Sequence, residues 1–279
     1  NRSGNQLLNY PLPANTGFSE VLQNIDALIE NSGWEFELNT INISKKNFKW
    51  RTNFNAAIPF SKMISYPGLE YSTNATKYIV GQPLNILRQY EFTGIDFNTG
   101  LYTFRDVNKD GVYNYNDRTK FARMGLLFSA GLGNQITYKN WSFDIFFQLV
   151  QQNKNFITYN ISMPGYMNNS PKAITDRAVP GVKTGRYQRA STGNPAATNA
   201  YSLSYSSDLG PTPANYVKLR NMAIGYNLTE LGKSNIGCRI FLQGQNLLTF
   251  TSYVGADPET EFKYLPTLRT ITFGATLIF

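Results

Sequence analysis

The last ten residues, 270–279, constrain the fold of this chain most strongly. Their odd positions read Ile271, Phe273, Ala275, Leu277 and Phe279, while their even positions read Thr270, Thr272, Gly274, Thr276 and Ile278. Up to Leu277 this is the period-2 pattern of a β-strand with one apolar and one polar face. Such a strand frays and aggregates at the end of a soluble sheet, but it is protected when it closes a barrel in a lipid bilayer. The pattern therefore favours a membrane barrel over the final strand of a soluble sandwich.

The composition excludes several classes of protein. The 279 residues contain no His and one Cys, Cys238, which removes His-based triads, His-rich zinc sites and internal disulfides. Aromatic residues make up 14% of the chain and charged residues 16%, a mixture typical of many strands with aromatic girdles and polar loops. The net charge of +8 does not indicate nucleic-acid binding, because the basic residues are scattered and their longest run is Lys45-Lys46.

Eight segments alternate well enough to be predicted as strands. They cover residues 3–10, 33–43, 47–57, 126–138, 141–152, 215–228, 236–249 and 267–279. In the fifth segment, for example, Phe143, Ile145 and Phe147 alternate with polar residues such as Asp144 and Gln148. Each segment has about the 9–11 residues that a tilted strand needs to cross a bilayer.

The lengths of the connections separate a barrel from a sandwich. Long connections (11–32, 58–125, 153–214 and 250–266) alternate with short ones (44–46, 139–140 and 229–235). All long loops of an antiparallel meander then fall at one end, as in outer-membrane barrels with short periplasmic turns and long extracellular loops. Loops of this length are uncommon in compact soluble domains.

The polar strand faces indicate a wide lumen. They carry Glu35, Glu37, Lys49, Arg51, Asp144 and Gln148. The interior of an eight-stranded barrel is filled by side chains and has no room for so many charges. The predicted fold is therefore all-β, a transmembrane antiparallel β-barrel of which this chain forms an arc of about eight strands.

Residues 106–117 have the spacing of a calcium-binding loop, with oxygen-bearing residues at positions 1, 3, 5, 9 and 12 and glycine, Gly111, at position 6. The candidate ligands are Asp106, Asn108, Asp110, Val112 through its carbonyl, Asn114 and Asp117. Position 12 is Asp instead of the bidentate Glu of EF-hands, which is closer to a dockerin-type loop. The alternative is an Asx-rich turn without metal, and the sequence leaves both open.

Two other features carry weaker signals. Asp257-Pro258-Glu259 followed by Glu261 suggests a paired-carboxylate hydrolase site, but a solvated turn opened by Asp-Pro is the favoured interpretation. Cys238 shares the apolar face of Ile240 and Leu242 and is interpreted as a packing residue. No catalytic residue and no organic cofactor are predicted.

Six blocks resemble the SusC/RagA family of TonB-dependent outer-membrane transporters, in the order that the family has them. They are residues 31–39 (NSGWEFELN), 81–84 (GQPL), 106–111 (DVNKDG), 216–221 (YVKLRN) with Gly225-Tyr226, 244–250 (GQNLLTF) and the closing strand. Each block is weak by itself, and together they cover about residues 30–279. The end of the chain also resembles the C-terminal signal by which outer-membrane barrels are recognised for insertion.

The resemblance implies a 22-stranded barrel in outer-membrane lipid, plugged by an N-terminal domain and energised through it by the TonB complex. It also implies a SusD-like surface lipoprotein as partner and import of oligosaccharides or peptides. Residues 1–279 would be the C-terminal portion of that barrel, with the plug domain and the signal peptide outside this chain. The alternative is a secreted β-sandwich module for glycan binding or adhesion, with a dockerin-like calcium loop.

Overall fold

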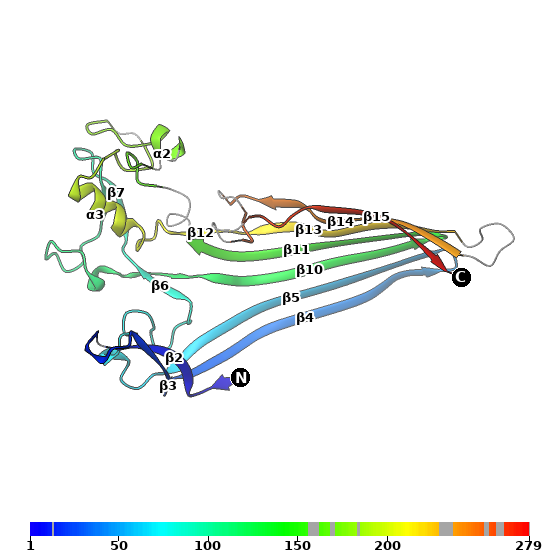
Figure 1. Cartoon of the computed structure of the whole chain (residues 1–279), viewed down its shortest axis with the longest axis horizontal. Coiled ribbons are helices and arrows are strands. Elements are labelled where there is room, and N and C mark those ends of the chain that lie inside the picture. The colour runs from blue at the N-terminus through cyan, green and yellow to red at the C-terminus, as the bar shows by residue number, and fades with distance from the viewer. Residues whose placement is uncertain are drawn as a thin grey trace. The chain divides into compact units, whose positions relative to one another are not determined.

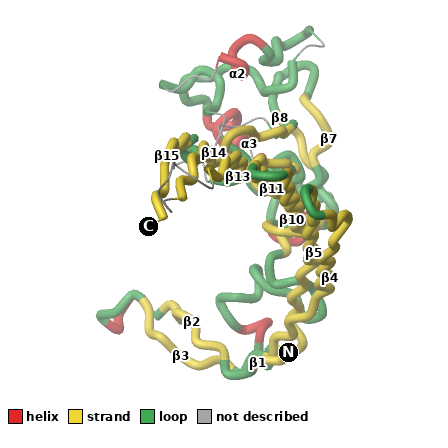
Figure 2. Tube along the Cα trace, turned by 90° about the vertical axis from the view of Figure 1, so that its right-hand side faces the viewer, coloured by secondary structure: helices red, strands yellow, loops and turns green. Residues whose placement is uncertain are grey.

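The computed structural model describes residues 1–12, 14–155, 162–167, 171–182, 185–228, 237–253, 257–260 and 265–278. They divide into two compact units, one built from residues 1–32, 60–125 and 153–212 and the other from residues 33–59, 126–152 and 213–279. Long strands lie side by side in the ribbon view (Figure 1), and they are the yellow segments of the tube view (Figure 2). Among the described residues, no helix has the length and apolarity needed to cross a membrane.

The main sheet has nine strands in the order β1-β4-β5-β10-β11-β13-β14-β15, with β12 paired to β11. Their bounds are β1 Arg2–Ser3, β4 Leu28–Lys45, β5 Phe48–Ser65, β10 Gly125–Tyr138, β11 Trp141–Asn155, β12 Pro211–Pro213, β13 Tyr216–Leu228, β14 Gly237–Thr251 and β15 Thr270–Ile278. Seven of the predicted strands are confirmed, five of them with bounds within three residues, while β4 begins five residues earlier and β5 ends eight residues later than predicted. Because the long strands form one continuous sheet instead of two packed sheets, the sandwich alternative is wrong.

The first predicted strand, residues 3–10, is split into two strands, β1 and β2 (Gln6–Pro11). Asn5 has a left-handed backbone (φ 51°) and interrupts it. Only β1 joins the main sheet, while β2 pairs with β3 (Glu20–Ile25) as a separate hairpin. That hairpin occupies part of residues 11–32, which the sequence assigned to a loop.

The strand register places apolar side chains on one face of the main sheet. One row across four strands reads Phe143, Ile224, Leu242 and Phe273, and the row beside it reads Asp144, Ala223, Gln243 and Thr272. Directly paired residues point to the same side of a sheet, and neighbours along a strand point to opposite sides. Phe273 is 73% exposed and Leu242 46%, so the apolar face is open. This is the pattern of a barrel wall with lipid outside and a polar lumen inside.

Aromatic pairs mark the short-turn end of the apolar face. Trp141 and Tyr226 are paired across β11 and β13 with ring centroids 4.7 Å apart. Phe48 and Tyr138 are paired across β5 and β10, with centroids 6.4 Å apart. Aromatic girdles at this level are expected where a barrel wall meets the membrane interface.

Two glycines on the polar face accept aromatic rings from the neighbouring strand. A Cβ atom at Gly131 would lie 2.9 Å from the Phe146 ring, and one at Gly274 would collide with the ring of Phe241. The outer ends of both rings therefore reach over backbone that glycine leaves bare on the polar face.

The long connections contain the smaller elements, including both described α-helices (Figure 2). They hold η1 Ala14–Thr16, η2 Leu69–Tyr71, β6 Ile86–Gln89, β7 Phe92–Ile95, β8 Tyr102–Phe104, η3 Tyr115–Asp117, β9 Lys120–Arg123, α2 Pro171–Thr175 and α3 Pro195–Ser204. They also have cores of their own: one cluster includes Tyr90, Tyr102 and Tyr201, and another includes Met63 and Tyr66. The loops are therefore packed structures and not extended polar links.

Candidate functional site

A β-bulge at Arg220 is the first element of the candidate site. In the ladder with β11, Phe146 and Phe147 pair with Asn221 and Leu219, so Arg220 is left out. The ladder with β14 shifts register at the same place. The apolar face consequently changes from odd residues (Val217, Leu219) to even ones (Met222, Ile224). Bulges re-aim side chains in this way, and simple alternation in the sequence cannot reveal them.

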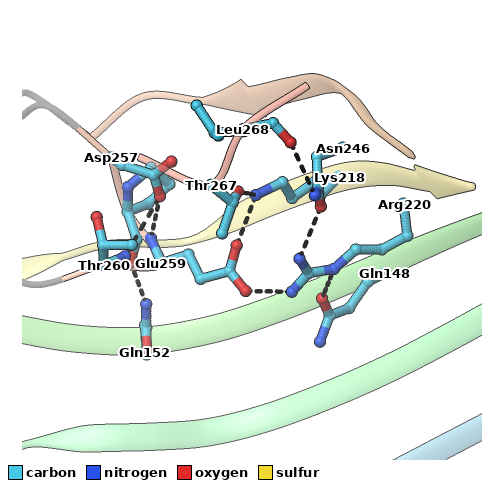
Figure 3. Close-up of polar contacts among 11 residues, drawn as sticks. Gln148, Gln152, Lys218, Arg220, Asn246, Asp257, Glu259, Thr260, Thr267 and Leu268 are labelled. Carbon is cyan, nitrogen blue, oxygen red and sulfur yellow. Dashed lines mark hydrogen bonds and ion pairs between the residues drawn. The ribbon is translucent and has the colours of Figure 1, made fainter. Parts of the chain in front are cut away.

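Arg220 and its neighbour Lys218 meet one carboxylate, that of Glu259 in the β14–β15 connection (Figure 3). Lys218 Nζ donates to Glu259 Oε2 at 2.5 Å and to Thr267 Oγ1 at 2.6 Å. An Arg220 guanidinium nitrogen donates to the other oxygen of Glu259. Arg220 Nε also donates to Gln148 Oε1 at 2.6 Å. The connection is thereby joined to β11 and β13.

Burial makes these charges depend on one another. The Lys218 side chain is 2% exposed, and those of Arg220 and Glu259 are 22% and 24% exposed. Burial raises the pKa of Glu259, but the hydrogen bonds and charges of Arg220 and Lys218 outweigh it and leave that pKa below its usual value. Glu259 is therefore ionised at neutral pH, and its single negative charge is shared by Lys218 and Arg220.

The solvated turn predicted at Asp257-Pro258-Glu259 is half right. The turn exists, since Asp257 Oδ1 accepts from the Glu259 and Thr260 amides at 2.7 and 3.3 Å. It is only partly solvated, because Asp257, Glu259 and Thr260 are half-buried and Pro258 is buried, with its carbonyl accepting from Gln152 Nε2 at 2.5 Å. The available signal was the pair Lys218 and Arg220 on one strand, because two cations near a polar barrel face require a counter-charge.

A polar cavity adjoins the ion pair. Its volume is about 470 Å³, and its lining includes Lys218, Asn246, Thr249, Thr267 and Arg269. Asn246 closes one side, since its amide donates to the Leu268 carbonyl at 3.1 Å and its Oδ1 accepts from Arg220 at 3.2 Å. Among the described residues, the site contains cations, hydroxyls, amides and the carboxylates of Asp257 and Glu259, the latter bound by Lys218 and Arg220. Glu261, the other carboxylate of the predicted hydrolase pair, lies outside the described residues.

In the candidate calcium loop, backbone amides of the loop itself donate hydrogen bonds to its carboxylates. Asp106 accepts from the Lys109 and Gly111 amides at 2.7 and 2.8 Å. Asp117, which is fully buried, accepts from the Val107 and Asn114 amides, both at 2.9 Å. These hydrogen bonds, that from Asn114 foremost, hold the pKa of Asp117 below its usual value.

The remaining candidate ligands are also held by local hydrogen bonds. Asp110 accepts from the Val112 amide at 2.8 Å and from the Asn108 side chain at 2.7 Å. Asn114 accepts from the Asn116 amide at 2.9 Å and caps η3. Within the described part of the chain, no group of three or more His, Cys, Asp or Glu residues is arranged to hold a metal ion. Calcium binding stays a prediction. Each carboxylate oxygen that accepts one hydrogen bond keeps a second lone pair, which can still coordinate a metal ion.

The single sheet, its apolar outer row, its polar inner row and its aromatic pairs define a class, that of outer-membrane β-barrels. No protein-family model matches the chain. TonB-dependent receptor P3 of Formosa agariphila is 29% identical and matches 96% of this chain and 30% of its own length. TonB-dependent receptor SusC of Bacteroides thetaiotaomicron is 24% identical, with 93% and 27% of the two chains matched.

Solved structures show the same fold. The RagAB peptide transporter superposes with a TM-score of 0.77 at 19% identity, covering 99% of this chain and 32% of that one. The resemblance to the SusC/RagA family of TonB-dependent receptors is thereby confirmed, and so is the outer-membrane location. The chain spans about 30% of the length of the curated relatives that it matches.

Proposed function

We propose that this chain is the C-terminal part of the barrel of a TonB-dependent transporter that imports nutrient oligomers, either oligosaccharides or peptides. The observation that carries the proposal is the apolar row Phe143–Ile224–Leu242–Phe273 with a polar row beside it on the opposite face. Such a wall separates lipid from a wet passage. The relatives, named as TonB-dependent receptors, support active import through that passage.

The long connections would form the rim on which a SusD-like surface lipoprotein docks. Their buried clusters around Tyr102 and Tyr66 support this, because a packed loop offers a defined surface. A stable interface needs well over about 1,000 Å², and the short turns at the other end cannot supply it. The chain contributes no catalytic group to this proposal, and the TonB complex would act through a plug domain outside it.

Uptake by the full-length receptor tests the import. Cells that carry the receptor should take up the oligomer, and loss of TonB should abolish uptake. Deletion of α3 (Pro195–Ser204) should abolish uptake or lipoprotein binding while the barrel stays folded, because the strands below keep their pairing. Normal uptake and normal partner binding after that deletion would contradict the rim assignment.

Cysteine labelling tests the wall itself. Labels at Phe273 and Leu277 should report lipid, and labels at Thr272 and Thr276 should report water, because these pairs lie on opposite faces of β15. The reverse pattern would overturn the orientation of the wall. Phe279 lies outside the described residues, and its deletion should reduce assembly if the C-terminal signal operates.

We also propose that residues 106–117 bind calcium outside the cell. The support is the ligand spacing together with Gly111 at φ 78°, the sharp turn that position 6 requires. Millimolar calcium should slow amide exchange in these residues in wild type and not in an Asp106→Asn/Asp110→Asn variant. Equal exchange with calcium and with a chelator would favour the bare Asx turn.

A further inference from the structure

The described parts of the β14–β15 connection contact the wall in a way that import alone does not explain. Its residues 257–260 and 265–268 are called the strap below. We propose that Glu259 pins the strap onto the inner face of the barrel wall, so that the strap narrows the passage taken by cargo. This proposal rests on the proposed import.

The register places the strap on the inner face. Lys218, which binds Glu259, is paired with Gln148 on β11 and Thr249 on β14. These three side chains share one side of the sheet. The adjacent row on the opposite side is apolar and consists of Leu149, Val217 and Phe250. A segment that binds Lys218 therefore lies on the polar, lumen side, and Figure 3 shows Glu259 directed at both cations from the strap.

Among the described contacts that hold the strap, the ion pairs of Glu259 with Lys218 and Arg220 are the strongest. The other hydrogen bonds involve neutral groups of the strap. Gln152 donates to the Pro258 carbonyl, and Lys218 donates to the hydroxyl of Thr267. Hydrogen bonds between charged groups are roughly twice as strong as neutral ones. Loss of the carboxylate would also leave Lys218, at 2% exposure, without the one ion-pair partner that it has among the described residues. Such a site relaxes by admitting water, which requires the strap to lift.

The strap does not lie flat on the strands. The cavity of about 470 Å³ beside Lys218 is lined by Pro258 and Thr267 of the strap and by Thr249 and Thr251 of β14. A segment held off the wall by a cavity extends further into a lumen than a flat one does. Leu265 and Leu268 of the strap are 86% and 79% exposed, and they bring apolar surface to a face that is otherwise polar.

Distance measurements test the pin in the full-length receptor. Spin labels at Leu268 on the strap and Asp144 on β11, in a Cys238→Ala background, should give one narrow distance distribution in wild type. Glu259→Gln should broaden it toward longer distances. The matched control is Asp257→Asn, which removes a carboxylate from the same strap but keeps the oxygen that accepts the Glu259 and Thr260 amides. An unchanged distribution in Glu259→Gln would overturn the pin.

A second variant covers the case in which Glu259→Gln fails to fold. Lys218→Met/Glu259→Gln removes the buried cation together with its partner, and Arg220 keeps its bonds to Gln148 and Asn246. We expect a folded barrel, judged by its heat-modifiable migration on gels, with the same broad distance distribution. A narrow wild-type distribution in this folded variant would also overturn the pin.

Uptake of cargo of graded length tests the narrowing. Glu259→Gln should raise uptake of long or bulky oligomers several-fold relative to the shortest one, while Asp257→Asn keeps the wild-type profile. A released strap with an unchanged length profile would overturn the narrowing. Absence of uptake in wild type as well would contradict the proposed import, whereas the distance measurement would still decide whether Glu259 holds the strap.

Discussion

Two acidic connections of this protein have opposite designs. In residues 106–117, Asp106 and Asp117 accept hydrogen bonds from backbone amides of their own loop. In the strap, Glu259 binds cations of β13, about 40 residues earlier in the chain. The first loop is stabilised by hydrogen bonds within itself, whereas the strap is held by side chains of the barrel wall.

This difference shows that the spacing of carboxylates along a chain does not reveal which groups they bind in the folded protein. The regular spacing of residues 106–117 predicted a calcium site. In the structure these residues form a turn whose carboxylates are hydrogen-bonded within the loop and whose Asn114 caps η3. The irregular Asp257-Pro258-Glu259 predicted a solvated turn and instead supplies the partner of a buried lysine. Local spacing is set by backbone geometry, while charge pairing is set by what the fold brings near.

The contrast between the two connections would be lost if Glu259 could be replaced without loss of folding stability. Glu259→Gln should destabilise the folded barrel by about 3 kcal/mol, the lower end of the range for a buried charge that loses its partner, because the strap can lift and let water reach Lys218. Thermal or denaturant unfolding in detergent measures this. Stability equal to that of the Asp257→Asn control would mean that Lys218 does not need its counter-charge.

Acid should weaken the same ion pair by a smaller amount. The pKa of Glu259 lies below its ordinary value of 4.5, so the carboxylate stabilises the fold at neutral pH and loses that effect as the pH falls through the lowered pKa. The strap distance should therefore stay constant from pH 7 to about 5 and broaden only in stronger acid. Broadening that begins above pH 5 would contradict the lowered pKa.

Changes at Asp117 should stay local. Asp117→Ala removes the acceptor of two backbone amides, so amide exchange should accelerate in residues 106–117 and remain unchanged in the main sheet. Asp117→Asn keeps one acceptor oxygen and should have a smaller effect. Faster exchange in β10 or β11 would show that this loop is not self-contained.

The smallest expected effect is that of Gly111→Ala. Gly111 has φ 78°, and no atom lies within 4 Å of the position that a Cβ would occupy. The cost is then the backbone term alone, about 1 kcal/mol, and it should appear as modestly faster exchange of the loop amides. No change at all would mean that the turn tolerates a relaxed backbone.

The strands were predictable because their pattern is local. β11 and β15 each carry a long period-2 alternation, and burial of one face in lipid leaves a single acceptable orientation. The pairing of β2 with β3 was missed because β3 is exposed except at Ile25, and a strand with almost no buried face shows no alternation. The interruption at Asn5 is a single backbone conformation that residue type only weakly favours.

The sequence by itself determined the class of wall: alternating strands, the order in which they pair, and long connections at one end. Each of these depends on neighbours within a strand or on the lengths between strands. Only the tertiary structure decided that Arg220 sits in a bulge and that Lys218 and Arg220 share the carboxylate of Glu259. The physical reason is that desolvation of a charge depends on everything packed around it, including residues far away along the chain.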